Sequence, residues 1–506
     1  MFQTQSLTVI VKWLAFGAIS IDLGLVIFIL CRRAAHNRFY SRKDAAQRRF
    51  SVIIAEYFVG KISLERSALL LKAGGGPERE ASRTLLLGSI RATNQRQATD
   101  LLVALGFVRE WTEQAFGKRR AGELLRSITQ DHGGSPPPHQ MSSRHKAGRL
   151  RRLRVFSISR AVAVSRLGRL SPEFSGCLMQ EALRDPSPYV GRMAVASIGR
   201  NQIPDGVPIL LQELRRSVDT ETDLPTRSIQ TALVRYPIAE LRHITFYLKR
   251  GSPRFRFLAV NSIREMCAKA ESVQPGDLEF PAQLRRWFLE EAVRDESPDV
   301  RARSAGVIAH FRSPEAMEAL RLLMGDPNEF VRLHSVRACA DPYYSGLIGD
   351  TLRRITDQRW RVREAAVKTV GSFQATGRQQ LEQYFLDTTD RYASEQIGEE
   401  LQRSGTALRI VSALAMPGDE GTRARKVCCK MAELGMVSLM AEELASEKSL
   451  DLRTQLLDVL SASDTPQFIG ALRSIVARQA DPLNRKAEVL LRVHESKPLN
   501  AAERTN

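Results

Sequence analysis

The 506-residue sequence predicts an all-α protein, an α-solenoid of helix pairs about 31 residues long preceded by one N-terminal transmembrane helix. Three observations lead to this fold class. Aromatic residues make up only 7% of the chain, and the visible runs favour helix-forming over strand-forming residues. One apolar run lies near the N-terminus, and a spacing of 31 residues recurs through the later part. An all-β architecture is therefore not expected.

The apolar run covers residues 13–31 and contains a single charged residue, Asp22. At about 1.5 Å per residue it is just long enough to cross a hydrocarbon core. We expect a transmembrane helix rather than a cleaved signal peptide, because the basic residues of a signal peptide would precede the run. Asp22 has two interpretations that stay open: an acid that a single span tolerates, or a contact with another transmembrane helix.

A basic segment, residues 32–49, follows the apolar run and carries a net charge of +6. The positive-inside rule then places residues 1–12 outside and the rest of the chain in the cytoplasm, which predicts a single-pass protein of the inner membrane. Basic residues beside a membrane span also attract anionic lipid headgroups. The residues expected to make this contact are Arg32, Arg33, Arg38, Arg42, Lys43, Arg48 and Arg49.

A short motif recurs along the second half of the chain. Val300, Val331 and Val362 lie 31 residues apart, and each is followed by an arginine and preceded five residues earlier by an aspartate. Small and apolar residues four, five and eight positions after each valine form one helix face, which must be buried against neighbouring units. Asp326 and Pro327 are typical of a helix start. The motif's polar residues are Asp295, Arg301, Asp326, Arg332, Asp357 and Arg363.

This motif at this spacing resembles HEAT repeats of the short type first named for phycobilisome lyases, here in a membrane-anchored bacterial protein. The match is strongest over residues 295–387, extends from 185 to 493, and is weak before residue 150. The resemblance implies that the acid and the arginine of successive repeats bond to one another as a structural ladder. The alternative, in which Arg301, Arg332 and Arg363 form a ligand-binding stripe, stays open.

The remaining boundaries follow from composition. Residues 50–131 are helical in pattern and are consistent with divergent repeats. Residues 132–148 are rich in Pro, Gly and Ser and predict a mobile linker. The solenoid is expected over residues 149–495 and a flexible tail over 496–506.

A second basic cluster lies within residues 132–170, which hold nine basic residues and no acid. With the first segment it accounts for +15 of the formal charge of +19, so the solenoid is close to balanced. Nucleic acid is therefore not expected as a partner, because a DNA-binding solenoid would spread basic residues along its groove. Three interpretations stay open: contact with the membrane, contact with an acidic partner, or a solvated helix face. The candidate contact residues are Arg149, Arg151, Arg152 and Arg154.

No catalytic, cofactor or metal motif stands out. The six cysteines lack CxxC spacing, there is no P-loop, HExxH or GxSxG, and His310 and His334 do not hold equivalent positions in their repeats. We therefore expect no enzyme activity, and predict a membrane-anchored scaffold or adaptor that binds or positions a protein partner, a membrane protein or a membrane-associated enzyme. The alternative is an enzyme or enzyme subunit of the HEAT-like lyase or DNA glycosylase type, which the resemblance also implies.

Overall fold

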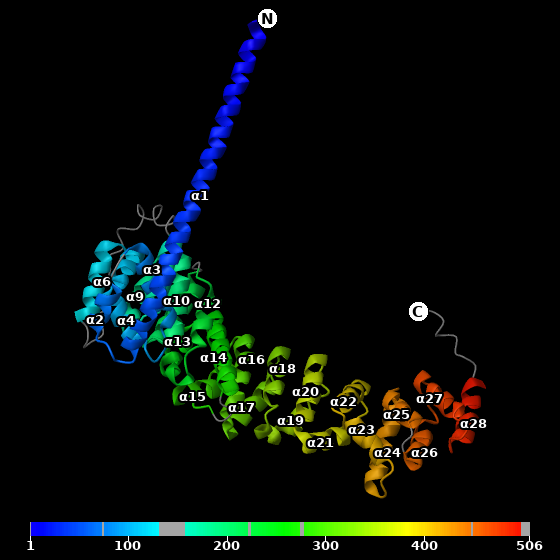
Figure 1. Ribbon diagram of the computed structural model, residues 1–506. Coiled ribbons are helices and arrows are strands. Elements are labelled where there is room, and N and C mark those ends of the chain that lie inside the picture. Colours follow the sequence, from blue (N-terminus) through cyan, green and yellow to red (C-terminus); the bar gives the residue numbers. More distant parts are fainter. Residues whose placement is uncertain are drawn as a thin grey trace. The chain divides into compact units, whose positions relative to one another are not determined.

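The computed structural model is helical wherever it shows regular structure (Figure 1). It describes residues 2–72, 75–130, 157–220, 224–273, 278–446 and 449–496; of residues 2–19, 129 and 130 only the backbone is described. The all-α fold class is thereby confirmed for these ranges. The predicted linker 132–148, the predicted tail after Ser496 and the second basic cluster from Arg149 to Arg154 lie outside the described residues.

The chain divides into two compact units, Met1–Pro237 and Ile238–Asn506. In the first unit the C-terminal part of α1 packs on α2 and α3 through Ala46, Phe50, Ile54 and Tyr57, which recur at helical spacing. Further along, α8, α10 and α12 pack on one another in that order. The helices are α1 (Phe2–Phe58), α2 (Leu64–Leu71), α3 (Gly76–Ser89), α4 (Gln95–Ala104), α5 (Phe107–Phe116), α6 (Lys118–Gln130), α8 (Ser157–Leu167), α9 (Pro172–Leu183), α10 (Pro188–Asn201), α11 (Gly206–Asp219) and α12 (Thr226–Leu233).

The expected transmembrane helix and inner-membrane localisation need correction. In the part of the chain that the structure describes, no helix has an apolar stretch long enough to cross a membrane. α1 continues without a break to Phe58, and its described apolar stretch between Asp22 and Arg32 measures about 14 Å at the rise of an α-helix, against the roughly 30 Å of a hydrocarbon core. Asp22 is exposed, and both interpretations of it assumed a membrane span that the described residues do not show. The side chains of residues 13–19 lie outside the described part.

The second unit is a stack of helix pairs. The first helices of successive pairs, α14, α16, α18, α20 and α22, pack on one another in order, and α17, α21 and α23 pack on the first helices beside them (Figure 1). The elements are η1 (Ile238–His243), α13 (Ile244–Arg250), α14 (Pro253–Val273), α15 (Ala282–Glu290), η2 (Ala292–Arg294), α16 (Pro298–Ile308), η3 (Ala309–Phe311), α17 (Pro314–Met324), α18 (Glu329–Ala338), η4 (Pro342–Leu347), α19 (Ile348–Leu352), α20 (Trp360–Ser372), α21 (Gln374–Asp387), α22 (Arg391–Arg403), α23 (Thr406–Ala413), α24 (Asp419–Glu433), α25 (Ser438–Ala445), α26 (Leu450–Leu460), α27 (Pro466–Ala477) and α28 (Asn484–Ser496).

The repeated valines form the centre of this stack. Val300, Val331 and Val362 lie in the first turn of α16, α18 and α20, and each is fully or almost fully buried. The helix that was expected to start at Asp326 and Pro327 starts two residues later. Asn328 is the N-cap of α18, and Asp326 accepts a hydrogen bond from the Asn328 backbone N–H at 2.8 Å, so it closes the turn ahead of the helix.

A left-handed residue recurs where the first helix of a pair ends. Gln202, Arg312 and Gln374 have φ values of 46°, 42° and 50°, and each lies twelve residues after the buried valine of its own repeat. A left-handed residue closes a helix by turning the chain sharply, and glycine is the usual choice. The sequence did not reveal this recurrence because none of the three residues is glycine.

Candidate functional site

The structure brings two pairs of the predicted ladder residues together. Arg301 Nε and Nη2 donate to the Asp326 carboxylate at 2.7 and 3.0 Å, and Arg332 makes the same bidentate contact with Asp357 at 2.8 and 2.9 Å. We call such an Arg–Asp pair between adjacent repeats a rung. Each arginine also uses Nη1, which for Arg332 donates to the carbonyls of Asp326 and Pro327 at 2.9 and 3.0 Å. Few donors of this guanidinium remain for a ligand.

Each rung aspartate also shapes the loop that carries it. Asp295, Asp326 and Asp357 accept a hydrogen bond from the backbone N–H two residues later, at 2.8 to 3.0 Å. Burial by itself raises the pKa of Asp357, but the hydrogen bonds from Arg332 and from the Arg359 N–H outweigh burial and hold that pKa below its usual value. The carboxylate is therefore ionised at neutral pH and stabilises the stack in that form.

Three further rungs went unnoticed in the sequence. Arg160 bonds Asp185 and Arg256 bonds Asp295, both bidentate, while Arg453 bonds Asp481 through one nitrogen and the Leu444 carbonyl through another. Arg160 precedes Asp185 by 25 residues, the separation also found for Arg301 and Asp326. A search of the sequence for an arginine 25 residues before an aspartate could therefore have identified the Arg160 rung. The Arg256 rung spans 39 residues because the insertion between α14 and α15 lengthens its repeat.

Arg363 holds the motif position but makes no rung. Its Nη1 reaches the Asp357 carbonyl at 3.4 Å, its guanidinium lies 5.5 Å from the Tyr392 ring centroid, and its buried Nε has no hydrogen-bond partner in the described part of the chain. The next aspartate expected in register, Asp387, is exposed, and Asp390 caps α22 instead. The step from Val362 to Tyr392 is 30 residues rather than 31, which moves the acid out of place.

The first basic segment lies along α1. Arg32, Arg33, Arg38, Arg42, Arg48 and Arg49 are exposed and Lys43 is half-buried. Lys43 lies 5.8 Å from the ring centroid of Tyr40, and Arg49 lies 5.5 Å from that of Phe50.

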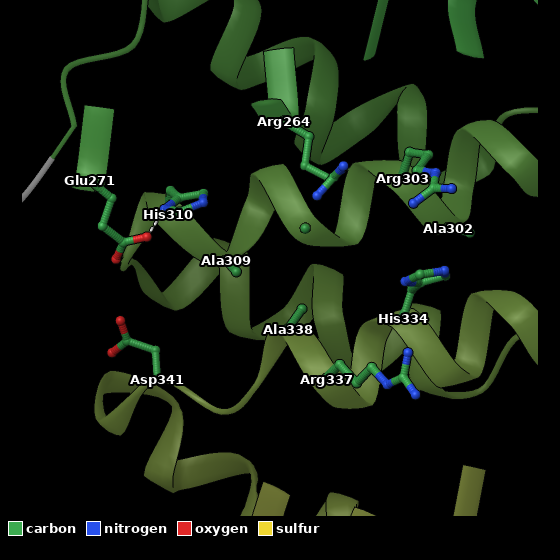
Figure 2. Close-up of a pocket in the computed structure, with 11 residues that line it drawn as sticks. Arg264, Glu271, Ala302, Arg303, Ala309, His310, His334, Arg337, Ala338 and Asp341 are labelled. Carbon is green, nitrogen blue, oxygen red and sulfur yellow. Dashed lines mark ion pairs between the residues drawn. The ribbon is translucent and has the colours of Figure 1, made fainter. Parts of the chain in front are cut away.

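A hollow of about 320 Å³ lies on the first helices of three successive pairs, α14, α16 and α18. Its floor consists of small residues, Ala302, Gly306, Ala309 and Ala338, and this lack of side-chain volume makes the depression. Figure 2 shows the ionisable side chains around it in two groups. Arg264, Arg303, His334 and Arg337 lie on one side; Glu271, His310 and Asp341 lie on the other.

The acidic side of the hollow is internally paired. Asp341 accepts two hydrogen bonds from Arg312, at 2.8 and 3.1 Å, and Glu271 lies 3.6 Å from His310 Nδ1 and 3.9 Å from Arg312 Nη2. Burial lowers the pKa of His310, and the charge of Glu271 opposes that effect. These two carboxylates are therefore already engaged and leave the basic side uncompensated.

The basic side has no acidic partner among the described residues. No carboxylate there lies within 4.0 Å of a guanidinium nitrogen of Arg264, Arg303 or Arg337. Arg264 makes only a 3.5 Å contact from Nη2 to Asn261, and its buried Nε lacks a hydrogen-bond partner. Burial first, and the charges of the three arginines second, lower the pKa of His334 to about 4, so this histidine is neutral at pH 7.

Gly306 positions Arg264. A Cβ at Gly306, in the last turn of α16, would lie 3.2 Å from Arg264 Cδ and 3.5 Å from its Cγ. The glycine therefore lets the aliphatic part of Arg264 lie directly on α16, although glycine inside a helix costs about 1 kcal/mol relative to alanine. Sequence reasoning singled out neither Arg264 nor Gly306, and it assigned no site to His310 and His334 because they do not hold equivalent positions in their repeats.

Three of the six cysteines are buried thiols. Cys267, Cys339 and Cys428 are buried, and burial raises the pKa of each thiol to about 12, so they stay protonated. Within the described ranges, no group of three or more His, Cys, Asp or Glu side chains is placed to hold a metal ion.

Comparison with known proteins supports the repeat assignment. The family model for HEAT repeats matches residues 286–351, which confirms the HEAT-repeat interpretation for the stretch from α15 to α19. One similar solved chain comes from the structure in which Kap95p binding induces the switch loops of RanGDP to adopt the GTP-bound conformation; it is 12% identical over 91% of this chain and 67% of that chain, with a TM-score of 0.35. Another comes from the Pds5-Scc1 complex, 12% identical over 92% and 79%, with a TM-score of 0.31. No curated protein matches the chain.

Proposed function

We propose that the chain is a protein-interaction scaffold whose HEAT-repeat stack presents a rigid surface to a protein partner. One observation carries this proposal. In the second unit the rung arginines use their donors inside the stack, whereas Arg264, Arg303 and Arg337 have no acidic partner among the residues that the structure describes. The first set is suited to holding the repeats together, and the second set is available to a partner.

The rungs are proposed as structural ladder contacts rather than a ligand stripe. A ligand stripe needs guanidinium groups that face solvent with free donors, and Arg332 has four of its donor contacts satisfied by the adjacent loops. The short repeat length is the feature shared with the phycobilisome-lyase type. No specific observation among the described residues favours a lyase or glycosylase activity.

The proposal is tested by isolating the full chain, affinity-tagged, from the cells that express it naturally. We expect one protein partner to be recovered in near-stoichiometric amount, and light scattering to give the mass of a defined complex. Val331→Asp, which disrupts the stack, serves as the matched negative control prepared in the same way. A full-length protein that remains alone at its own mass under these conditions contradicts the scaffold function.

A further inference from the structure

We infer that the basic hollow on α14, α16 and α18 binds an acidic segment of the partner, a short peptide stretch rich in Glu or Asp, through Arg264, Arg303 and Arg337. This inference deepens the proposed function and rests on it. The motif arginines do not enter it, because the structure engages them in rungs or, for Arg363, leaves them outside the hollow.

Two arginines of the hollow, Arg264 and Arg303, carry a charge at a half-buried position without an acidic partner among the described residues. Arg264 and Arg303 are only partly exposed, so water screens the repulsion between their guanidinium groups less than at a fully exposed position, whereas Arg337 is exposed at the rim of the hollow. Two arginines of this unit with similar burial have carboxylate partners, Arg256 with Asp295 and Arg312 with Asp341, whereas Arg363 has none among the described residues. A carboxylate supplied by a partner would complete the missing half of the same kind of contact, and charge-assisted hydrogen bonds of this kind are about twice as strong as neutral ones.

The length of the row of basic residues matches that of a short extended peptide. Packed helices lie about 8 to 10 Å apart, so basic residues on three successive first helices form a row about 20 Å long. An extended peptide rises about 3.3 Å per residue, and about six residues cover that distance. The hollow of about 320 Å³ accommodates side chains of such a peptide over its floor of small residues.

The restricted extent of the positive charge favours peptide over nucleic acid. Duplex binding draws its affinity from many phosphate contacts spread along a surface. Here the opposite end of the same hollow carries Glu271 and Asp341, which would repel a continuing phosphate backbone. A short acidic stretch that ends before these carboxylates is not subject to that repulsion.

The test uses the full chain and fluorescein-labelled hexaglutamate, with hexaglutamine as the uncharged probe. The variant Arg264→Gln/Arg303→Gln is compared with Arg286→Gln/Arg391→Gln, whose arginines are strongly exposed and lie outside the hollow. Both variants lower the net charge of +19 by the same two charges, so general attraction of a polyanion is matched. We expect hexaglutamate to bind the hollow variant at least about tenfold more weakly, as loss of hydrogen bonds to charged groups implies, and to bind the control variant almost as wild type does.

A second measurement needs no substitution at the half-buried Arg264. Hexaglutamate should protect Arg264, Arg303 and Arg337 of the wild-type chain from phenylglyoxal, as mapped by mass spectrometry, and should leave Arg286 and Arg391 unprotected. Equal weakening by the two variants, equal binding of hexaglutamine, or uniform protection of all five arginines overturns the inference. Tighter, hollow-dependent binding of a 12-base-pair DNA duplex overturns the choice of an acidic peptide.

The outcomes separate this inference from the proposed function. A stoichiometric protein partner that binds the Arg264→Gln/Arg303→Gln variant as well as wild type leaves the scaffold function standing and refutes the hollow as its site. Hollow-dependent binding of hexaglutamate by a chain that recovers no protein partner supports the acidic-segment site and refutes the scaffold function.

Discussion

Replacing Arg332 with alanine should locally destabilise the stack between α18 and α20. Arg332 is only 13% exposed and its partner Asp357 only 4%, so the substitution leaves a nearly buried carboxylate whose remaining hydrogen bond comes from the Arg359 N–H at 3.0 Å. Removing one partner of a buried pair costs about 3 to 5 kcal/mol. Because the Arg332 guanidinium reaches water at one edge, we expect the lower end, about 3 kcal/mol.

Arg363 is the matched control, since it holds the same motif position and has no rung. Arg363→Ala removes a 3.4 Å hydrogen bond and the contact with the Tyr392 ring, which is worth about 0.5 to 1 kcal/mol, and it also removes a buried unpaired Nε. The expected loss is about 1 kcal/mol or less. The difference of about 2 kcal/mol between the two variants corresponds to roughly a thirtyfold difference in the local opening equilibrium.

Hydrogen–deuterium exchange of the full chain measures this difference where it arises. A stack of repeats need not unfold in one step, so amide exchange locates the destabilised repeat, whereas a denaturation midpoint only ranks variants by overall stability. Exchange of the α20 amides, residues 360–372, should be faster in Arg332→Ala than in Arg363→Ala, and exchange in α26 and α27 should not change. Equal effects of the two substitutions on α20 would refute the rung as the cause. Unchanged exchange in Arg332→Ala together with lost partner binding would instead assign Arg332 to a ligand stripe.

Three further expectations concern the same unit. Val331→Asp, at a fully buried position, should destabilise the repeat by more than about 4 kcal/mol and lower the urea midpoint. Val489→Asp, at an exposed position, should cost less than about 0.5 kcal/mol and leave the midpoint as in wild type. Similar midpoints for the two variants would contradict the packing. Gln374→Gly should stabilise α21 by about 0.5 to 1 kcal/mol because it relieves a left-handed residue with φ of 50°, and Gln374→Ala should not; thermal denaturation distinguishes them. Asp357 has a lowered pKa in the folded chain, so its contribution is complete above the unfolded pKa near 3.9 and is lost as pH falls through the folded value. The difference in urea midpoint between wild type and Asp357→Asn should therefore narrow below about pH 4, and a constant difference would show that the carboxylate charge contributes nothing.

The repeats could be predicted because burial constrains residues at regular spacing. Val300, Val331 and Val362 occupy one site in successive pairs and had to be small and apolar, so their interval of 31 residues was visible. The rung of Arg160 was less visible because the residue before it is Ser159 rather than valine. The membrane helix was predicted wrongly because hydropathy was judged over residues 13–31 alone, whereas α1 continues through the basic segment to Phe58.

The hollow could not be predicted, because it is built from positions that periodicity does not constrain. Arg303 and His334 both lie three residues after their valines, and Gly306 and Arg337 both lie six residues after them, so equivalent positions carry different side chains. Positions that face solvent are free to vary between repeats, and a surface for one particular partner requires that they do. The regular part of the sequence therefore reports how the stack is held together. Recognition of a partner depends instead on residues that differ between equivalent positions of the repeats. Only the three-dimensional structure shows that three such residues, Arg264, Arg303 and Arg337, line one hollow.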